Sequence, residues 1–171
     1  MKEKQVSPFC TEVDNFLQSI ASDFSEIGAL IQESLCVKES DELENIKKAG
    51  KVAIWVQDKV IQEVENIIDS EVRMKHCDIS KKIEAMFENP QEIKSLETST
   101  KTDREFADLA YTPIVQSGGA YDLRPQAESN DNDLSYDTVL CSVGAKYYEY
   151  NCNVVRTLFI DPDNVIHLIS L

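Results

Sequence analysis

The feature that most constrains the fold is a single apolar stripe that follows Ser40. Apolar residues recur at spacings of three and four from Leu43 to Ile68, which predicts one amphipathic helix of about 30 residues. Ser40 is placed to cap its N-terminus, and Asp41 and Glu42 complement the positive end of the helix dipole. The stripe is too short and irregular to favour a coiled coil, so we expect the helix to pack across a sheet or along another helix.

Shorter helices are predicted on both sides of this stripe. Apolar spacing predicts two of them before it, over residues 13–20 and 27–35. A third is predicted after it, from Asp78 to Glu88, and Asn89-Pro90 ends that helix. The run 97–105 carries no apolar residue and is predicted to be a linker or a mobile loop.

From residue 106 the pattern changes to that of strands. Residues 106–115 read as strand segments interrupted by Pro113, and Gly118-Gly119 marks a turn. Two stronger strands are predicted over 138–145 and 154–160, the first apolar enough to be buried on both faces. Helices followed by antiparallel strands predict an α+β fold.

Charge restricts the kind of partner. The chain has 31 acidic and 17 basic residues, a net charge of −14. A chain this acidic repels nucleic-acid phosphates as a whole, so direct DNA binding is disfavoured and basic partners are favoured. The sequence carries no apolar run long enough to cross a membrane.

The spacing of cysteine and histidine residues gives little indication of a metal or cofactor site. The five cysteines are scattered and form no Cys-x-x-Cys pair, so a classical zinc framework is excluded and reduced, mostly buried thiols are expected. His76 and Cys77 are adjacent, but no further ligand is near them in sequence, and a structural role is favoured over a metal pair. We expect no cofactor.

The two strong strands resemble the first β-hairpin of the pita-bread fold of metal-dependent aminopeptidases. In that family two aspartates 11 residues apart bind a pair of divalent metals. Val155-Arg156-Thr157 matches the second strand, which places Asn153 and Ser142 at the two aspartate positions. Two metals about 4 Å apart need anionic oxygen ligands, and these residues are neutral. The resemblance also implies that the family's remaining His and Glu ligands would lie beyond residue 171.

One branch of this fold, the N-terminal domain of the large subunit of the FACT histone chaperone, is more closely similar. Residues 111–119 read Tyr-Thr-Pro-Ile-Val-Gln-Ser-Gly-Gly and resemble its Tyr-Pro-Pro-x-x-Gln-Ser-Gly-Gly stretch. Residues 121–131 contain similar Asp-Leu-Arg-Pro and Ser-Asn-Asp elements, and 152–157 read Cys-Asn-Val-Val-Arg-Thr against its Ser-Asn-x-x-Arg-Thr. The likeness covers roughly residues 24–163. It implies that 1–38 are the end of an N-terminal lobe or a connecting segment, and that 39–171 are the first half of an aminopeptidase-like domain, in a truncated or partial chain.

The resemblance implies a non-catalytic interaction protein of the nucleus and chromosome, acting in transcription elongation, DNA replication and repair. Its expected partners are histones, nucleosomes and the HMG-box subunit of the same complex. An acidic loop over residues 122–137 is either solvated or a contact for basic histone tails. Its candidate contacts are Asp122, Glu128, Asp131, Asp133 and Asp137. Arg156, Gly118 and Gly119 are candidates for structural support of a vestigial cleft. A metal-dependent aminopeptidase and a fragment without independent function are the alternatives.

Overall fold

The computed structural model describes residues 7–20, 27–124 and 126–160. The chain divides into two compact units, 1–38 and 39–171. The first contains two helices, α1 (Pro8–Ile20) and α2 (Gly28–Cys36), in agreement with the apolar spacing. The assignment of these units to an N-terminal lobe and to half of a pita-bread domain stays a prediction.

The second unit is built on α3 (Ser40–Asp69), the long helix that the apolar stripe predicts. The capping prediction was wrong by one residue, because Ser40 is the first helical residue and Glu39 is the N-cap. The Glu39 backbone N–H donates to Oε2 of Glu42 at 2.7 Å, which satisfies one of the free donors at this helix end. Most of the stripe from Ala49 to Ile67 is buried, but Ile54 is exposed.

Further short helices connect α3 to the strands. They are α4 (His76–Ala85), η1 (Met86–Glu88), α5 (Pro90–Thr100) and η2 (Arg104–Phe106). The prediction of a linker over 97–105 was therefore wrong for residues 97–100, which form the last turn of α5. Asn89 ends η1 as predicted, but its side chain also accepts the N–H of Gln91 at 2.9 Å and so caps the next helix.

Three strands form one antiparallel sheet in the order β1-β2-β3. They are β1 (Ala107–Ser117), β2 (Thr138–Tyr147) and β3 (Tyr150–Phe159). The β1–β2 register is irregular between Leu109 and Tyr111 and again between Tyr111 and Ile114, where Pro113 was predicted to interrupt the strand. The third strand begins earlier than predicted, directly after a two-residue turn at Tyr148-Glu149.

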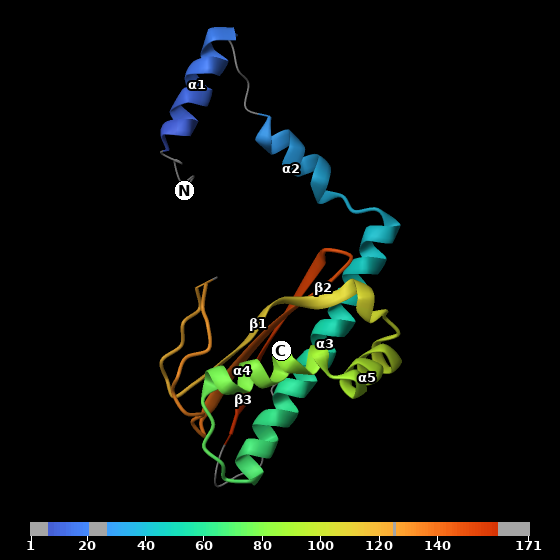
Figure 1. The fold of residues 1–171 in the computed structure, drawn as a ribbon, viewed down its shortest axis with the longest axis vertical. Helices are drawn as coiled ribbons and strands as arrows, with labels where there is room; N and C mark the ends of the chain where they lie inside the picture. The colour runs from blue at the N-terminus through green and yellow to red at the C-terminus, as the bar shows by residue number, and fades with distance from the viewer. Residues whose placement is uncertain (1–6, 21–26, 125, 161–171) are drawn as a thin grey trace. The chain divides into compact units, whose positions relative to one another are not determined.

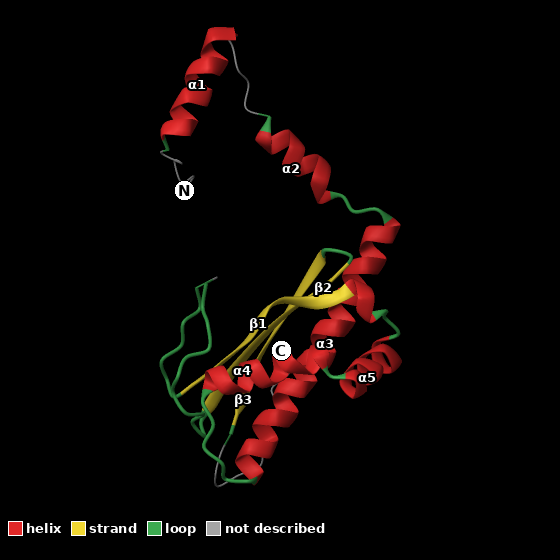
Figure 2. Cartoon of the chain, viewed as in Figure 1, coloured by secondary structure: helices red, strands yellow, loops and turns green. Residues whose placement is uncertain are grey.

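The core lies between the helices and one face of the sheet. Helix α3 packs on β2 and β3, and α4 packs on β1 (Figures 1 and 2). Val139, Cys141, Val143 and Ala145 of β2 are buried, whereas Leu140, Ser142 and Lys146 between and beyond them are partly exposed. The expectation that this strand is buried on both faces was therefore wrong, because the helices cover one face only. Among the described residues, no helix has the length and apolar character needed to cross a bilayer.

Candidate functional site

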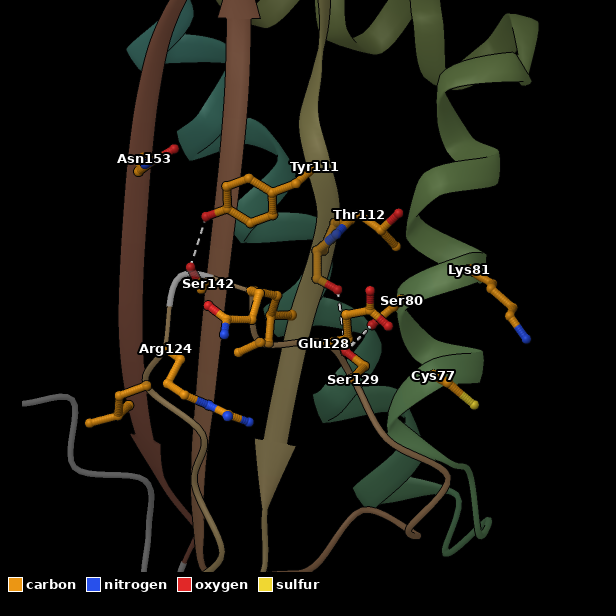
Figure 3. A pocket seen from close by; sticks show the side chains of 15 residues that line it. Cys77, Ser80, Lys81, Tyr111, Thr112, Arg124, Glu128, Ser129, Ser142 and Asn153 are labelled. Atoms are coloured by element: carbon orange, nitrogen blue, oxygen red, sulfur yellow. Dashed lines mark hydrogen bonds between the residues drawn. The ribbon is translucent and has the colours of Figure 1, made fainter. Parts of the chain in front are cut away.

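The uncovered side of the sheet carries the candidate site, a pocket of about 810 Å³. Ser142 of β2 and Asn153 of β3 lie at its floor, and Tyr111 reaches over them from β1 (Figure 3). The pocket extends past β1 to α4 and to the acidic loop of residues 122–137. The remaining lining residues are Cys77, Ser80, Lys81, Thr112, Pro113, Ile114, Leu123, Arg124, Gln126, Ala127, Glu128 and Ser129.

Strand register brings the two predicted residues together. Ser142 lies opposite Val155, and Asn153 lies opposite Gly144, so Ser142 and Asn153 are diagonal neighbours on one face. The Tyr111 hydroxyl lies 2.8 Å from Oγ of Ser142. A Cβ atom added to Gly144 would lie 2.8 Å from Cδ1 of Tyr111 and 2.7 Å from Oδ1 of Asn153. Glycine at 144 is therefore what lets the Tyr111 ring lie against the sheet.

The donors on this floor do not fit a pair of divalent metals. Ser142 and Asn153 offer a hydroxyl and an amide, whereas a two-metal site needs carboxylates to offset its charge. Within the described residues, no group of three or more His, Cys, Asp or Glu side chains is arranged to hold a metal ion.

Backbone hydrogen bonds fasten the acidic loop to the start of α4. The N–H groups of His76 and Cys77 donate to the carbonyls of Asn132 and Asn130, both at 3.0 Å, and that of Leu134 donates to Met74 at 2.9 Å. The buried His76 ring adds a contact, with Nδ1 2.7 Å from Oδ1 of Asn130. His76 therefore contacts residues of the acidic loop. These contacts support the structural role that we favoured for it over a metal pair.

Ser129 fastens the same loop to the irregular part of β1. Its Oγ accepts the N–H of Val115 at 2.8 Å and lies 2.6 Å from Oγ of Ser80 on α4. The backbone of residues 129–134 is therefore held on two sides, by α4 and by β1.

Two of the five predicted acidic contacts already have a basic side chain within ion-pair distance. Asp122 forms a bidentate pair with Arg124, at 2.9 Å to Nε and 2.7 Å to the terminal nitrogen, which lowers the pKa of this carboxyl to about 2. Asp131 accepts from the Cys77 thiol at 3.1 Å and lies 3.8 Å from Nζ of Lys75, and both lower its pKa. The hydrogen bond to Asp131 raises the pKa of the Cys77 thiol, which opposes a role as a nucleophile.

The other three acids are exposed: Glu128, Asp133 and Asp137. Glu128 lines the pocket, whereas Asp133 and Asp137 do not. No Lys or Arg nitrogen of the described residues lies within ion-pair distance of them. The negative charges of these three side chains are therefore the ones on the loop that remain available to a basic partner.

The three predicted supporting residues lie away from the pocket wall. Arg156 lies opposite Cys141, so its side chain leaves the sheet on the helix-covered side, opposite to Ser142 and Asn153. It is exposed and does not line the pocket. Gly118 and Gly119 form the turn after β1 with φ of 81° and 84°, a conformation that favours glycine.

Sequence reasoning missed Tyr111 as a site residue. The residue stood within the string 111–119 that carried the resemblance, but its position over Gly144 depends on the irregular register of β1. The thiol expectation was also partly wrong, because only Cys141 is buried and Cys36 is exposed.

Solved structures share this arrangement of helices and sheet. The N-terminal domain of FACT complex subunit SPT16 from Eremothecium gossypii superposes with a TM-score of 0.75 at 24% identity, over 94% of this chain and 39% of that chain. The X-Pro aminopeptidase from Thermotoga maritima gives 0.52 at 23% identity, over 92% and 39%. The chain therefore has an α+β fold of the pita-bread, aminopeptidase-like class.

Sequence comparison narrows this class to a family. Residues 44–170 match the model of metallopeptidase family M24, and the chain belongs to that family. It is 33% identical over 169 residues to FACT complex subunit SPT16 of Debaryomyces hansenii, covering 94% of this chain and 16% of that relative. The chain thus spans only about a sixth of the length of the curated relatives it matches.

Proposed function

We propose that this chain is a non-catalytic, histone-binding part of a FACT-type complex. The observation that carries the proposal is the 33% identity to FACT complex subunit SPT16 over 94% of the chain. Its setting would be the nucleus and the chromosome, in transcription elongation, DNA replication and repair. Its proposed partners are histones, nucleosomes and the HMG-box subunit of the complex.

The chemistry of the pocket floor supports a role without catalysis. We take Ser142 and Asn153 to stand where catalytic members of the fold carry metal-binding aspartates. Two neutral oxygen donors would leave the charge of a metal pair uncompensated. The alternative, a metal-dependent aminopeptidase, has membership of family M24 in its favour and this donor set against it.

The exposed acids Glu128, Asp133 and Asp137 are the proposed contacts for basic histone segments. Because Asp122 is paired with Arg124 and Asp131 lies near Lys75, these two contribute less free charge. The backbone of residues 130–134 is already held by its bonds to Met74, His76 and Cys77, so binding would cost little additional ordering of this part of the loop. Exposed charges of this kind act mainly on association rate and salt dependence.

The test is a salt titration of core-histone binding by the purified chain. We expect Glu128→Gln/Asp133→Asn/Asp137→Asn to weaken binding about tenfold at low salt and to flatten its salt dependence. The matched control is Asp58→Asn/Glu65→Gln/Asp69→Asn, which removes the same number of exposed charges from α3. Equal losses in both variants would mean that only net charge matters and would reject the loop as the contact. No histone binding by the folded wild-type chain would reject the proposal itself.

A further inference from the structure

We infer that the exposed face of the Tyr148 ring, beside Asp103 and Glu105, binds a lysine or arginine side chain of a basic polypeptide. Tyr148 begins the two-residue turn between β2 and β3, at the end of the sheet beside the start of α3 and away from the acidic loop (Figure 1). The inference adds a second surface to the proposed binding of basic segments, and it rests on that proposal only for the class of partner.

The aromatic contacts of Tyr148 leave one face of its ring open. The other face is stacked on Phe106, with the ring centroids 4.0 Å apart and the planes 15° from parallel. The Tyr147 centroid lies 5.2 Å from that of Tyr148 and 6.2 Å from that of Phe106, so Tyr147 stands beside the stack and not on the open face. Tyr148 is 49% exposed, whereas Tyr147 is buried. The stack therefore holds an aromatic face toward solvent.

The backbone of the turn holds this ring in a conformation that most side chains avoid. Tyr148 and Glu149 have φ of 46° and 66°, at a place where a two-residue hairpin turn ordinarily carries Asn-Gly. A bulky residue in this region is an outlier, and strained residues of this kind cluster at functional sites. The Tyr148 N–H donates to the carbonyl of Phe106 at 3.1 Å, which fixes the turn against the end of η2. The strained turn thus displays an anchored ring.

The charges near the ring favour a cation as its partner. Asp103 and Glu105 are exposed, and neither lies within ion-pair distance of a Lys or Arg nitrogen in the part of the chain that the structure describes. Partial burial raises the pKa of the Tyr148 hydroxyl, and the charges of Asp103 and Glu105 also raise it, which places both carboxylates near the ring. Their attraction for a cation adds to that of the ring face. The same carboxylates repel nucleic-acid phosphates, which disfavours a base stacked on this ring.

Lys48 provides an example of the same contact within the chain. Its Nζ lies 4.9 Å from the centroid of the neighbouring Tyr147 ring. Among the described residues, no Lys or Arg occupies the corresponding place over Tyr148. Lys146, the nearest basic residue in sequence, lies 3.6 Å from the carboxylate of Glu149. The open face of Tyr148 is therefore available to a cation from another molecule.

The probe for this site is a synthetic peptide of alternating glycine and arginine, compared with the same peptide carrying neutral citrulline. Calorimetry on the full chain measures the Kd. We expect Tyr148→Asn to weaken binding about two- to fivefold, the contribution of an exposed cation–π contact, and Tyr148→Phe, which keeps the aromatic face, to match the wild type. Asparagine tolerates a positive φ, so the Tyr148→Asn variant should fold, and its Tm verifies this.

A second pair of variants tests the carboxylates. Asp103→Asn/Glu105→Gln removes their two charges, and Asp58→Asn/Glu65→Gln removes two exposed charges from α3 as the matched control. Asparagine at position 103 keeps the oxygen that accepts the N–H of residue 105, so η2 retains its cap. At low salt we expect the first pair to weaken peptide binding about threefold more than the control pair. Equal losses would show that only net charge matters and would reject the site.

Three further results would overturn the inference. They are equal binding by the wild-type and Tyr148→Asn chains, equal binding of the citrulline peptide, and binding of a single-stranded oligonucleotide that depends on Tyr148. Nuclear Overhauser contacts between arginine side-chain protons and the Tyr148 ring would support the site directly, and their absence in the complex would reject it.

The arginine peptide also separates this site from the acidic loop. Glu128→Gln/Asp133→Asn/Asp137→Asn should leave the arginine contact to Tyr148 in place, because the loop precedes β2 and the turn follows it. Loss of that contact in the loop variant would reject a separate site. Failure at Tyr148 alone leaves the proposed histone contact on the loop standing, and loss of the loop proposal does not remove the contact at Tyr148.

Discussion

Nε2 of the buried His76 ring lies 2.7 Å from Oγ of Ser117. The N–H of Ser135 donates to the same Oγ at 2.8 Å. On the other side of the ring, Asn130 Oδ1 accepts the N–H of Asn132, so it is Nδ1 of His76 that carries the proton shared with this oxygen. One histidine thereby joins α4, the end of β1 and the acidic loop.

Replacing His76 by alanine should destabilise the protein by about 2–4 kcal/mol, because it leaves a cavity and two unpaired polar partners. Urea unfolding measures this cost. Lys81→Ala, an exposed position one turn later in α4, is the control and should change stability by less than about 0.5 kcal/mol. Similar values for both variants would contradict the structural role of His76.

Gly144→Ala should cost about 1–3 kcal/mol, because the new methyl group overlaps the Tyr111 ring. Gly50→Ala is the matched comparison, since its Cβ would lie 3.5 Å from Sγ of Cys152, an ordinary contact, within α3. That substitution should stabilise the protein by about 0.5–1 kcal/mol through helix propensity. Thermal unfolding of the two variants should move Tm in opposite directions, and equal shifts would argue against the close fit at Gly144.

Gln57→Leu should stabilise the fold by about 1–2 kcal/mol. The Gln57 side chain is buried in α3, and neither amide atom has a hydrogen-bond partner within the described part of the chain. A leucine of similar volume removes that desolvation cost. Chemical denaturation measures the effect, and a loss of stability would show that the amide is satisfied in solution.

Asp122 should titrate with a midpoint near 2, against its ordinary 3.8, when followed by carboxyl carbon resonances. Because the folded-state pKa is the lower one, the pairing contributes stability above pH 3.8 and loses it as the pH falls through 2. Arg124→Gln should raise the midpoint toward 3.8, short of a full return because the N–H of residue 124 still donates to Oδ1 of Asp122. An unchanged titration midpoint of Asp122 in this variant would show that the bidentate pair does not form in solution.

Cys141 should be the slowest thiol to react with an alkylating reagent. Burial raises its pKa to about 12, and the side chain is covered by the core. The exposed Cys36 should react first. Peptide mass spectrometry after timed alkylation gives the order, and early labelling of Cys141 in the folded chain would contradict the burial of β2.

Elements that follow a regular sequence period were predicted well, whereas the positions of individual side chains were not. The stripe from Leu43 to Ile68 defined α3 because one buried face imposes its spacing. The helix over 90–100 was missed because its last turn is Glu-Thr-Ser-Thr, with hydroxyls that bond back to the preceding turn. Ser142 and Asn153 were brought together as the register of a regular hairpin requires. The position of the Tyr111 ring over Gly144 could not be predicted, because it arises from an irregular register that no period describes.

The long helix has a consequence for how the chain emerges during synthesis. The Tyr150 hydroxyl of β3 donates to Glu42 near the start of α3 across a separation of 108 residues. At roughly 5–20 residues per second, α3 leaves the ribosome some 5 to 20 s before that partner exists. Throughout that interval its valine-rich face is without the strands that will cover it. The nascent protein is therefore most exposed to aggregation before β2 and β3 are made, and that is when a chaperone would protect it.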